Sequence, residues 1–400
     1  MTRTVLISGA GIAGSVAAYW LSRGGFVPTV VEKAPDLRRT GGHAVDLAGV
    51  AIEVIERMGL LPAVQDARVR RDGLVFHRRR GAPVRMPRLS ATISDRHVEI
   101  QRDDLVSILY DAAAPHAEYL FDDTVTAVGD EGGGVAVEFQ NSAPRTFDLV
   151  IGADGLHSRV RRLVFGPEER FRHDLGACLS VFSHANTLAL DREVLGYADV
   201  DRTAFAYAVE DGRRARALLL FRPGTVAAVD LRDRRQRLNL VHDAFGDIEH
   251  LLPFAIDAAE ESDDFYFDTI SQLRMETWSH GRITLVGDAA YSPGPAVGGG
   301  TALAVLGAYV LADELTGAGG DHRAAYERTE TVMRQPVAQS RKVGPSALAR
   351  LVPRSRLAAR TTPHLMKLLT RLPRSATRAL FSLQGSGSHT LDDFSSAAAR

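Results

Sequence analysis

The sequence contains a single cysteine, Cys178, so no disulfide can form within the chain. A lone cysteine is typical of proteins in a reducing compartment, and we expect this one in the cytoplasm. Long apolar runs are also missing: the longest, residues 302–312, is about half of a membrane span. We therefore expect no integral membrane segment, and residues 5–7 form too short an apolar stretch for a signal peptide.

Neither positive nor negative charge is in excess, because 48 basic and 49 acidic side chains give a formal net charge of -1. Such a balance predicts no nucleic-acid partner. The chain has no G-x-S-x-G, no H-E-x-x-H and no paired-cysteine spacing, so we expect neither a hydrolase nucleophile nor a metal site.

The first 32 residues have the pattern of a dinucleotide-binding unit. Residues 5–7 predict a buried parallel strand, residues 12–23 a helix, and residues 28–31 a second strand. The segment GAGIAG, with glycines at the G-x-G-x-x-G spacing, separates the first strand from the helix. This order is the context in which the spacing indicates a bound nucleotide.

Each glycine of this turn has a separate physical task. Gly9 makes the tight turn, Gly11 lets a pyrophosphate approach the backbone, and Gly14 lets the helix pack closely. The helix then begins with Ile12 and Ala13, and the free N–H groups of its first turn favour a phosphate.

An acidic residue, Glu32, follows the second predicted strand and precedes Lys33. It lies about 20 residues beyond the glycines, where a carboxylate accepts hydrogen bonds from a ribose. A carboxylate there favours an unmodified 2′-hydroxyl over a 2′-phosphate. The motif alone therefore predicts FAD or NAD at this site, rather than NADP.

Two later strands also end in acidic residues. Residues 149–151 run into Asp154, and residues 283–286 run into Asp288, before a Pro/Gly loop and a helix start near Thr301. Ligands of open α/β sheets bind at the carboxyl ends of the strands, so both acids can accept hydrogen bonds from a polyol. The alternative is that each acid caps a helix.

Several ordered segments resemble the class A flavoprotein monooxygenases, which have the para-hydroxybenzoate hydroxylase fold. The matching segments are GAGIAG with VVEKAP, QRDDL, DLVIGADGLHSRVR and LVGDAAYSPGPAVGGG, within residues 3–330. Within that family, EIQRDDL and GGHAVDLAG are similar to the tetracycline-inactivating and polyketide-tailoring enzymes.

The resemblance, together with the strand and helix patterns, implies an α/β fold. We expect a Rossmann-type FAD-binding domain of residues 1–75, 98–170 and 276–330. An antiparallel β-sheet substrate domain would comprise residues 76–97 and 171–275. A C-terminal helical cap (331–384) and a flexible tail (385–400) would follow.

The resemblance also implies cofactor contacts. It places the pyrophosphate at the glycine turn and Arg102, and the adenosine ribose at Glu32. It assigns the ribityl chain or a ribose to Asp288, and both FAD and the nicotinamide cofactor to Asp154. Further implied flavin contacts are Asp46, Pro295, Gly298, Gly299, Gly300 and Thr301.

This chain departs from the family pattern in the last motif. Tyr291 stands where the family commonly has histidine, and Gly299 stands where it commonly has glutamine. A loop of glycines can still bind the flavin, because backbone N–H groups need no side chain. The departures leave the side chain beside the flavin ring unassigned.

Candidate substrate residues lie on predicted strands in the middle of the chain. Phe205 and Tyr207 share one face, and we expect Phe221 to join them in covering an aromatic substrate. The alternative is that all three are core aromatics. His43, in a loop that the family places near the flavin, is a candidate catalytic hydrogen-bonding group, or else a structural residue.

The implied activity is that of an FAD-dependent monooxygenase. Such an enzyme uses NAD(P)H and O2 to oxygenate an aromatic or polyketide-like small molecule through a flavin C4a-hydroperoxide, in antibiotic tailoring or inactivation. A single dinucleotide motif predicts no separate NAD(P)H domain. The alternatives are a flavin dehydrogenase or reductase without oxygen transfer, and a non-catalytic binding flavoprotein. The chain would act as a monomer or homodimer.

The C-terminal region is basic, with eleven Lys or Arg and no acid in residues 331–391. Five prolines are expected to break it into short helices: Pro336, Pro345, Pro353, Pro363 and Pro373. A helical cap is favoured over attachment to an anionic membrane surface, because the net hydrophobicity is modest.

Overall fold

The computed structural model describes residues 3–37, 43–77, 82–87, 97–130, 132–209, 212–224, 233–252, 256–296, 298–369 and 391–394. The first two residues of GGHAVDLAG lie outside these ranges, and so do Pro373 and residues 385–390 of the expected tail. No helix in the described ranges is long and apolar enough to cross a bilayer.

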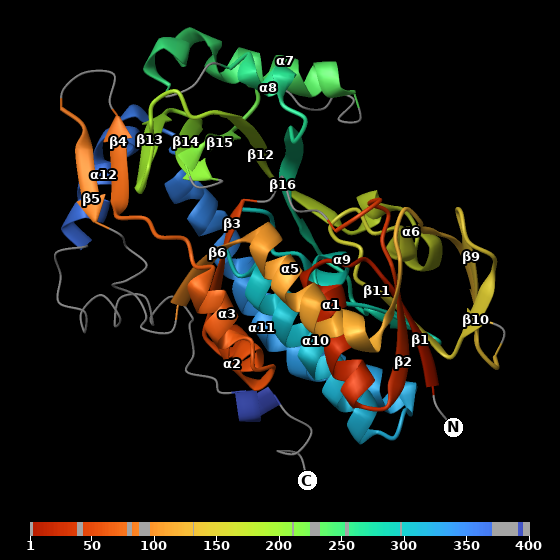
Figure 1. Cartoon of the computed structure of the whole chain (residues 1–400). Helices are drawn as coiled ribbons and strands as arrows, with labels where there is room; N and C mark the ends of the chain where they lie inside the picture. Colours follow the sequence, from red (N-terminus) through yellow and green to blue (C-terminus); the bar gives the residue numbers. More distant parts are fainter. Residues whose placement is uncertain are drawn as a thin grey trace.

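One half of the molecule is built on a six-stranded sheet in the order β17-β18-β11-β1-β2-β7. Strands β11, β1 and β2 of this sheet lie side by side near the N-terminus in Figure 1. All neighbouring strands are parallel except β17 and β18. The bounds are β1 Arg3–Ser8, β2 Phe26–Val31, β7 Glu118–Leu120, β11 Leu149–Gly152, β17 Ser279–His280 and β18 Ile283–Leu285.

The predicted strand–turn–helix–strand unit is confirmed. Helix α1 spans Ile12–Arg23, and Gly24 is its C-cap. A Cβ at Gly14 would lie only 1.9 Å from the Gly9 carbonyl oxygen, so α1 can approach the turn only with glycine there.

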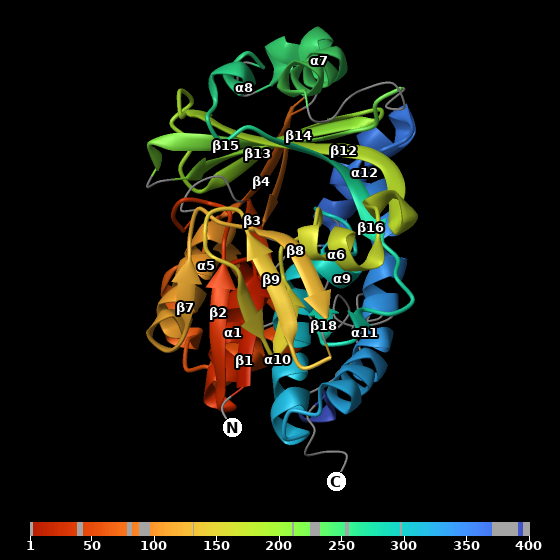
Figure 2. The ribbon, with the colours of Figure 1, turned by 90° about the vertical axis from the view of Figure 1, so that its right-hand side faces the viewer.

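Helices cover one face of this sheet and a smaller sheet covers the other (Figure 2). Helix α1 packs against α5 (Arg102–Ala113) and α10 (Gly300–Gly317). The smaller sheet, β10-β9-β8, contains the antiparallel pair of β8 (Val125–Asp130) and β9 (Val135–Phe139). The remaining elements on this half include α2 Val50–Arg57, α3 Leu61–Asp66, α6 Arg159–Phe165, α9 Asp288–Tyr291, β10 Arg145–Phe147 and the pair β3 Ala44–Ala48 and β6 His97–Gln101.

A second sheet of seven strands lies over the carboxyl ends of the first sheet, in the order β16-β12-β15-β14-β13-β4-β5 (Figure 2). Every pair is antiparallel except β13 and β4, which are parallel. The sheet already includes residues 73–75, which we expected in the FAD-binding domain. The bounds are β4 Gly73–His77, β5 Val84–Pro87, β12 Arg172–Ala185, β13 Glu193–Asp199, β14 Arg202–Val209, β15 Arg214–Phe221 and β16 Tyr266–Leu273.

The register of β14 and β15 decides which aromatic side chains share a face. Phe205 pairs with Leu218, whereas Phe221 pairs with Arg202. Because side chains alternate along a strand, Phe221 lies on the opposite face from Phe205 and Tyr207. It packs with Phe245 in the core beneath α7 (Arg234–Phe245) and α8 (Ala258–Glu261). The expectation that Phe221 joins the other two is therefore wrong.

Up to residue 369, where the described part of this region ends, the C-terminal segment forms two long helices rather than several short ones. Pro336 and Pro345 lie inside α11 (His322–Leu351), and Pro363 lies inside α12 (Arg356–Leu369). A proline inside a helix costs about 3 kcal/mol, yet α11 continues. Its Met333, Val337 and Leu348 side chains are buried in the cores, and this packing stabilises the helix despite the prolines.

Part of the expected flexible tail is packed. The turn η5 (Leu391–Phe394) lies against α2. Leu391 and Phe394 are buried, and the Leu391 N–H donates to Glu53 Oε2 at 2.8 Å. Apolar side chains near the end of the chain thus fill a gap in the core that the local sequence does not reveal.

Candidate active site

The carboxyl ends of neighbouring strands bring the predicted cofactor residues together. Four adjacent strands, β18, β11, β1 and β2, lead to Asp288, Asp154, the glycine turn and Glu32, respectively. Because the strands are parallel, these groups lie along a single edge of the sheet. The seven-stranded sheet covers that edge (Figure 2).

The glycine turn is shaped to receive a phosphate group. Gly9 has a φ of +105°, and a Cβ there would lie 2.6 Å from the Ala153 carbonyl oxygen. The space over Gly11 is open, because the nearest atom to a Cβ added at Gly11 would be Arg102 Nη2, at 3.9 Å. No side chain caps the N-terminus of α1, and its first turn has no acid. Free N–H groups facing a guanidinium fit a pyrophosphate.

Glu32 is fixed beside this turn. Its Oε2 accepts a hydrogen bond from Ala10 N–H at 2.9 Å, and its Oε1 accepts one from Ala34 N–H at 3.0 Å. A carboxylate has about four acceptor sites, so two remain for the hydroxyls of a ribose. The neighbouring Lys33 is exposed.

Arg102 connects three segments that are far apart in the sequence. Its backbone N–H donates to the His43 carbonyl oxygen at 3.3 Å, while its side chain reaches over Gly11. Its positive charge is also close enough to Asp288 to oppose the rise in that carboxyl's pKa that burial causes. The structure therefore brings Arg102, Asp288 and the glycine turn together, as the resemblance implies.

The carboxylate of Asp288 lies between Gly287 and the start of α10. Burial raises its pKa, and a hydrogen bond with Ser292 and the charge of Arg102 oppose that rise. The same side chain is exposed to solvent. Its Oδ1 would lie 3.8 Å from a Cβ on Gly300, at the start of α10, so the carboxylate stands at the cofactor edge where it can accept from a polyol.

The glycine loop before α10 needs its glycines. Gly298 and Gly299 have φ values of +87° and +83°, and a Cβ at Gly299 would lie 2.6 Å from Ser340 Oγ. Helix α10 begins at Gly300, next to the predicted start at Thr301, and no side chain caps it. Its N-terminus is a second uncapped positive helix end at the same edge.

Asp154 caps α6. It accepts hydrogen bonds from the Ser158 hydroxyl and from the N–H groups of Arg159 (2.8 Å) and Val160 (3.1 Å). The helix-capping alternative is therefore confirmed for Asp154. A contact with the cofactor stays a prediction.

His43 lies near the inner face of the seven-stranded sheet. Burial and the positive charges of Arg102 and Arg216 lower its pKa to about 4, so the imidazole is neutral at physiological pH. Arg216 is itself buried, on β15, and lies opposite Tyr207 in the strand register. Arg216 was not predicted as a site residue, although an arginine within the apolar strand RARALLLF was a signal for it.

The two aromatic residues of this inner face are packed against neighbours. The Tyr207 ring lies 4.0 Å from the Arg71 guanidinium, and its pKa is raised by burial. Phe205 packs edge-on against Phe76, with ring centroids 5.9 Å apart. Both side chains thus have core contacts, as the alternative interpretation held, on the face that looks toward the cofactor edge.

Asp46 stands slightly apart from these groups. Its carboxylate lies on β3 and meets His97 Nε2 at 2.8 Å. Pro295, which is half-buried, belongs to the loop that leads to the glycines before α10. For both residues, contact with the flavin stays a prediction.

Residues 2–339 match the family described as FAD binding domain. The chain belongs to this family, the class A flavin monooxygenases. A Legionella longbeachae flavin-dependent monooxygenase is 35% identical over 348 residues, which cover 85% of this chain and 87% of the relative. An uncharacterised Mycobacterium tuberculosis protein is 42% identical over 328 residues, covering 81% and 88%.

The crystal structure of the tetracycline destructase Tet(51) has the same fold, with a TM-score of 0.80 and 31% identity. The match covers 94% of this chain and 98% of that one. The resemblance seen in the sequence is confirmed. The two uncapped helix ends, the open space over Gly11 and the Arg102 guanidinium fit FAD as the cofactor of this family.

Proposed function

We propose that this family member uses NAD(P)H and O2 to oxygenate an aromatic or polyketide-like small molecule. The observation that carries the proposal is the cofactor edge, where Arg102, Asp288 and the uncapped ends of α1 and α10 converge. Reduced FAD, when bound there, supplies the electrons that activate O2. The residues of the chain bind, orient and exclude water.

Each group on the edge has a defined task in this proposal. The N–H groups of α1 and the Arg102 guanidinium hold the pyrophosphate, and Glu32 accepts from the adenosine ribose. Asp288 accepts from the polyol chain and so fixes where the flavin ring stands. The uncapped N-terminus of α10 would offer its N–H groups and partial positive charge to an electron-rich oxygen of the bound flavin, which would favour the reduced form.

The inner face of the seven-stranded sheet would contact the substrate. His43, neutral at physiological pH, can donate one hydrogen bond and accept another. Arg216 and Tyr207 add a cation and a phenol within the same buried region. A flat, oxygenated substrate satisfies both the aromatic and the polar side chains of such a face.

A fused-ring polyketide is the substrate class that the comparisons support. The solved relative is described as a tetracycline destructase, and it matches almost the whole length of this chain. Antibiotic inactivation or tailoring follows from that class. One dinucleotide-binding unit serves the flavin, so the nicotinamide would reduce it without a domain of its own.

The test is oxygen incorporation by the FAD-loaded protein. NADH and NADPH oxidation are measured with a panel of phenols, anthraquinones and tetracyclines under labelled O2. We expect at least one compound to accelerate oxidation and to gain one labelled oxygen atom. Accelerated oxidation with an unlabelled product indicates a dehydrogenase. Ligand binding that accelerates nothing indicates a binding protein, and either result refutes the proposal.

A further inference from the structure

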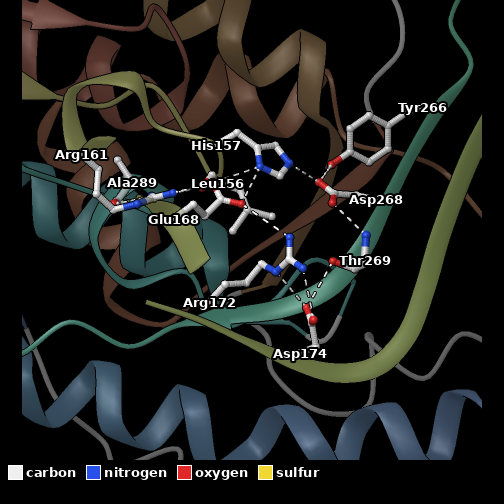
Figure 3. Close-up of polar contacts among 10 residues, drawn as sticks. All are labelled: Leu156, His157, Arg161, Glu168, Arg172, Asp174, Tyr266, Asp268, Thr269 and Ala289. Carbon is white, nitrogen blue, oxygen red and sulfur yellow. Dashed lines mark hydrogen bonds and ion pairs between the residues drawn. The ribbon is translucent and has the colours of Figure 1, made fainter. Parts of the chain in front are cut away.

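A chain of charged side chains joins the two sheets (Figure 3). His157, in the loop between β11 and α6, meets a carboxylate at each ring nitrogen. Nδ1 lies 3.0 Å from Glu168 Oε1, and Nε2 lies 2.8 Å from Asp268 Oδ2. Glu168 follows α6, whereas Asp268 belongs to β16 of the seven-stranded sheet. We call Arg161, Glu168, His157 and Asp268 the inter-sheet ion cluster.

The cluster needs the imidazolium form of His157. Hydrogen bonds with Asp268 and Glu168 raise the pKa of His157 to about 9, although burial opposes the rise. A neutral imidazole has one N–H and can donate to one carboxylate, whereas the imidazolium donates to both. About half of the His157 side chain is exposed, so protons exchange freely with the solvent.

At its other end the cluster reaches the cofactor edge. Arg161 is completely buried and donates to Glu168 Oε2 at 2.7 Å. It also donates to the carbonyl oxygens of Ala289 (2.9 Å) and Leu156 (2.6 Å). Ala289 directly follows Asp288, and Leu156 directly precedes His157. The cluster therefore connects β16 to both acidic loops of the edge.

Other charged and titratable groups around His157 support the same arrangement. Tyr266 donates its hydroxyl to Asp268 Oδ2 at 2.9 Å. Arg172, on β12, lies 3.9 Å from Glu168 and forms an ion pair with Asp174. Glu168 stays ionised, because His157, Arg161 and Arg172 lower its pKa more than burial raises it. Both carboxylates thus have further partners that fix their positions.

We propose that His157 is a positioning residue, which holds β16 and with it the seven-stranded sheet over the cofactor edge. The inner face of that sheet carries Phe205 and Tyr207, so the cluster sets how closely this face approaches the bound flavin. His157 touches neither flavin nor substrate in this role. The effect on oxygen transfer rests on the proposed function; the effect on the sheet does not.

The sheet is tested first, by hydrogen exchange of the FAD-loaded protein without substrate. Protection of residues 266–273, corrected for intrinsic exchange, is compared at pH 7 and pH 9.5. Wild-type protection should fall at pH 9.5, where most of the imidazole has lost its proton. His157→Gln should lose roughly tenfold in protection already at pH 7, because it cannot donate to both carboxylates as a cation.

His157→Arg is the rescue variant, since a guanidinium stays charged and presents several donors. In this variant, the protection of residues 266–273 should be the same at pH 9.5 as at pH 7. His173→Gln is the matched control: His173 is an exposed residue of the adjoining strand β12, and this variant should behave as wild type. Equal protection in wild type at the two pH values overturns the proposal. The proposal is also overturned if residues 266–273 of His157→Gln are as strongly protected at pH 7 as those of wild type. These wild-type and His157→Arg measurements remain decisive if His157→Gln fails to fold.

Oxygen transfer is tested second, as product formed per NAD(P)H consumed at saturating FAD. The ratio should fall severalfold in His157→Gln and return in His157→Arg. The NAD(P)H that is consumed without forming product should be matched by hydrogen peroxide, because its electrons reduce O2 without oxygen transfer. An unchanged ratio in His157→Gln overturns the positioning role in catalysis. If wild type oxygenates no compound, the proposed function fails instead, and the exchange data still decide what the cluster does.

Discussion

Replacement of Glu32 tests the assignment of the cofactor edge most directly. The hydrogen bond from Ala10 N–H, at 2.9 Å, holds the Glu32 carboxylate beside the glycine turn with acceptor sites to spare. A hydrogen bond to a charged group is worth about 1.5–3 kcal/mol. Glu32→Ala should therefore raise the FAD dissociation constant roughly 10- to 100-fold.

The assay is a titration of FAD into apoprotein, followed by flavin fluorescence. Glu32→Gln keeps one acceptor oxygen and should give an intermediate constant. Glu118→Gln is the control, because Glu118 lies on β7 of the same sheet and bonds Thr29 and Arg145 instead of the glycine turn. Its constant should equal that of wild type.

The alanine variant also leaves the N–H groups of Ala10 and Ala34 without the Glu32 carboxylate. The melting temperatures of the two apoproteins measure this separate effect on the turn. A dissociation constant for Glu32→Ala equal to that of wild type would refute the reasoning, because the carboxylate would then serve only the turn.

Four further changes have defined outcomes. Gly14→Ala should weaken FAD at least tenfold in the same titration, because its Cβ would lie 1.9 Å from the Gly9 carbonyl oxygen; wild-type affinity would refute the close packing of α1. Asp288→Ala should lower the product formed per NAD(P)H consumed at saturating FAD; equal ratios would show that Asp288 does not position the flavin. Leu391→Ala should cost about 2–5 kcal/mol in chemical denaturation, and no cost would mean that η5 adds nothing to the core. The pKa of His43 is lowered to about 4 in the folded protein, so the unfolded chain binds this proton more readily. The free energy of unfolding should therefore decrease as the pH falls from 6.5 towards 4. His43→Asn should lack that contribution in melting temperatures measured across this range, and an identical slope would contradict the assignment.

The cofactor edge could be predicted from the sequence because its signals are local. Apolar runs of three or four residues specify the strands of the parallel sheet, and glycines specify turns that no other residue can make. Gly9 and Gly14 show this directly, since a Cβ at either position would collide with backbone oxygen atoms. Helix α1 begins and ends where the sequence predicts. The order of the motifs then indicated the family.

The expectation that prolines break the C-terminal region into short helices was wrong, because it considered only the residues next to each proline. Pro336 and Pro345 each remove a backbone donor, but burial of Met333, Val337 and Leu348 depends on partners elsewhere in the chain. The face taken by Phe221 could not be predicted either, because strand register is set by pairing between β14 and β15.

The sequence by itself determined the dinucleotide-binding unit, the three acidic strand ends and the family of the chain. Only the tertiary structure decided how charged groups far apart in the sequence meet. His157 lies 111 residues from Asp268. The pKa of the half-buried His43 is lowered to about 4 because the fold partly desolvates it and places it near Arg102 and Arg216. The physical reason is that glycine turns and apolar runs act through neighbouring residues, whereas electrostatic interactions and burial depend on distances in space.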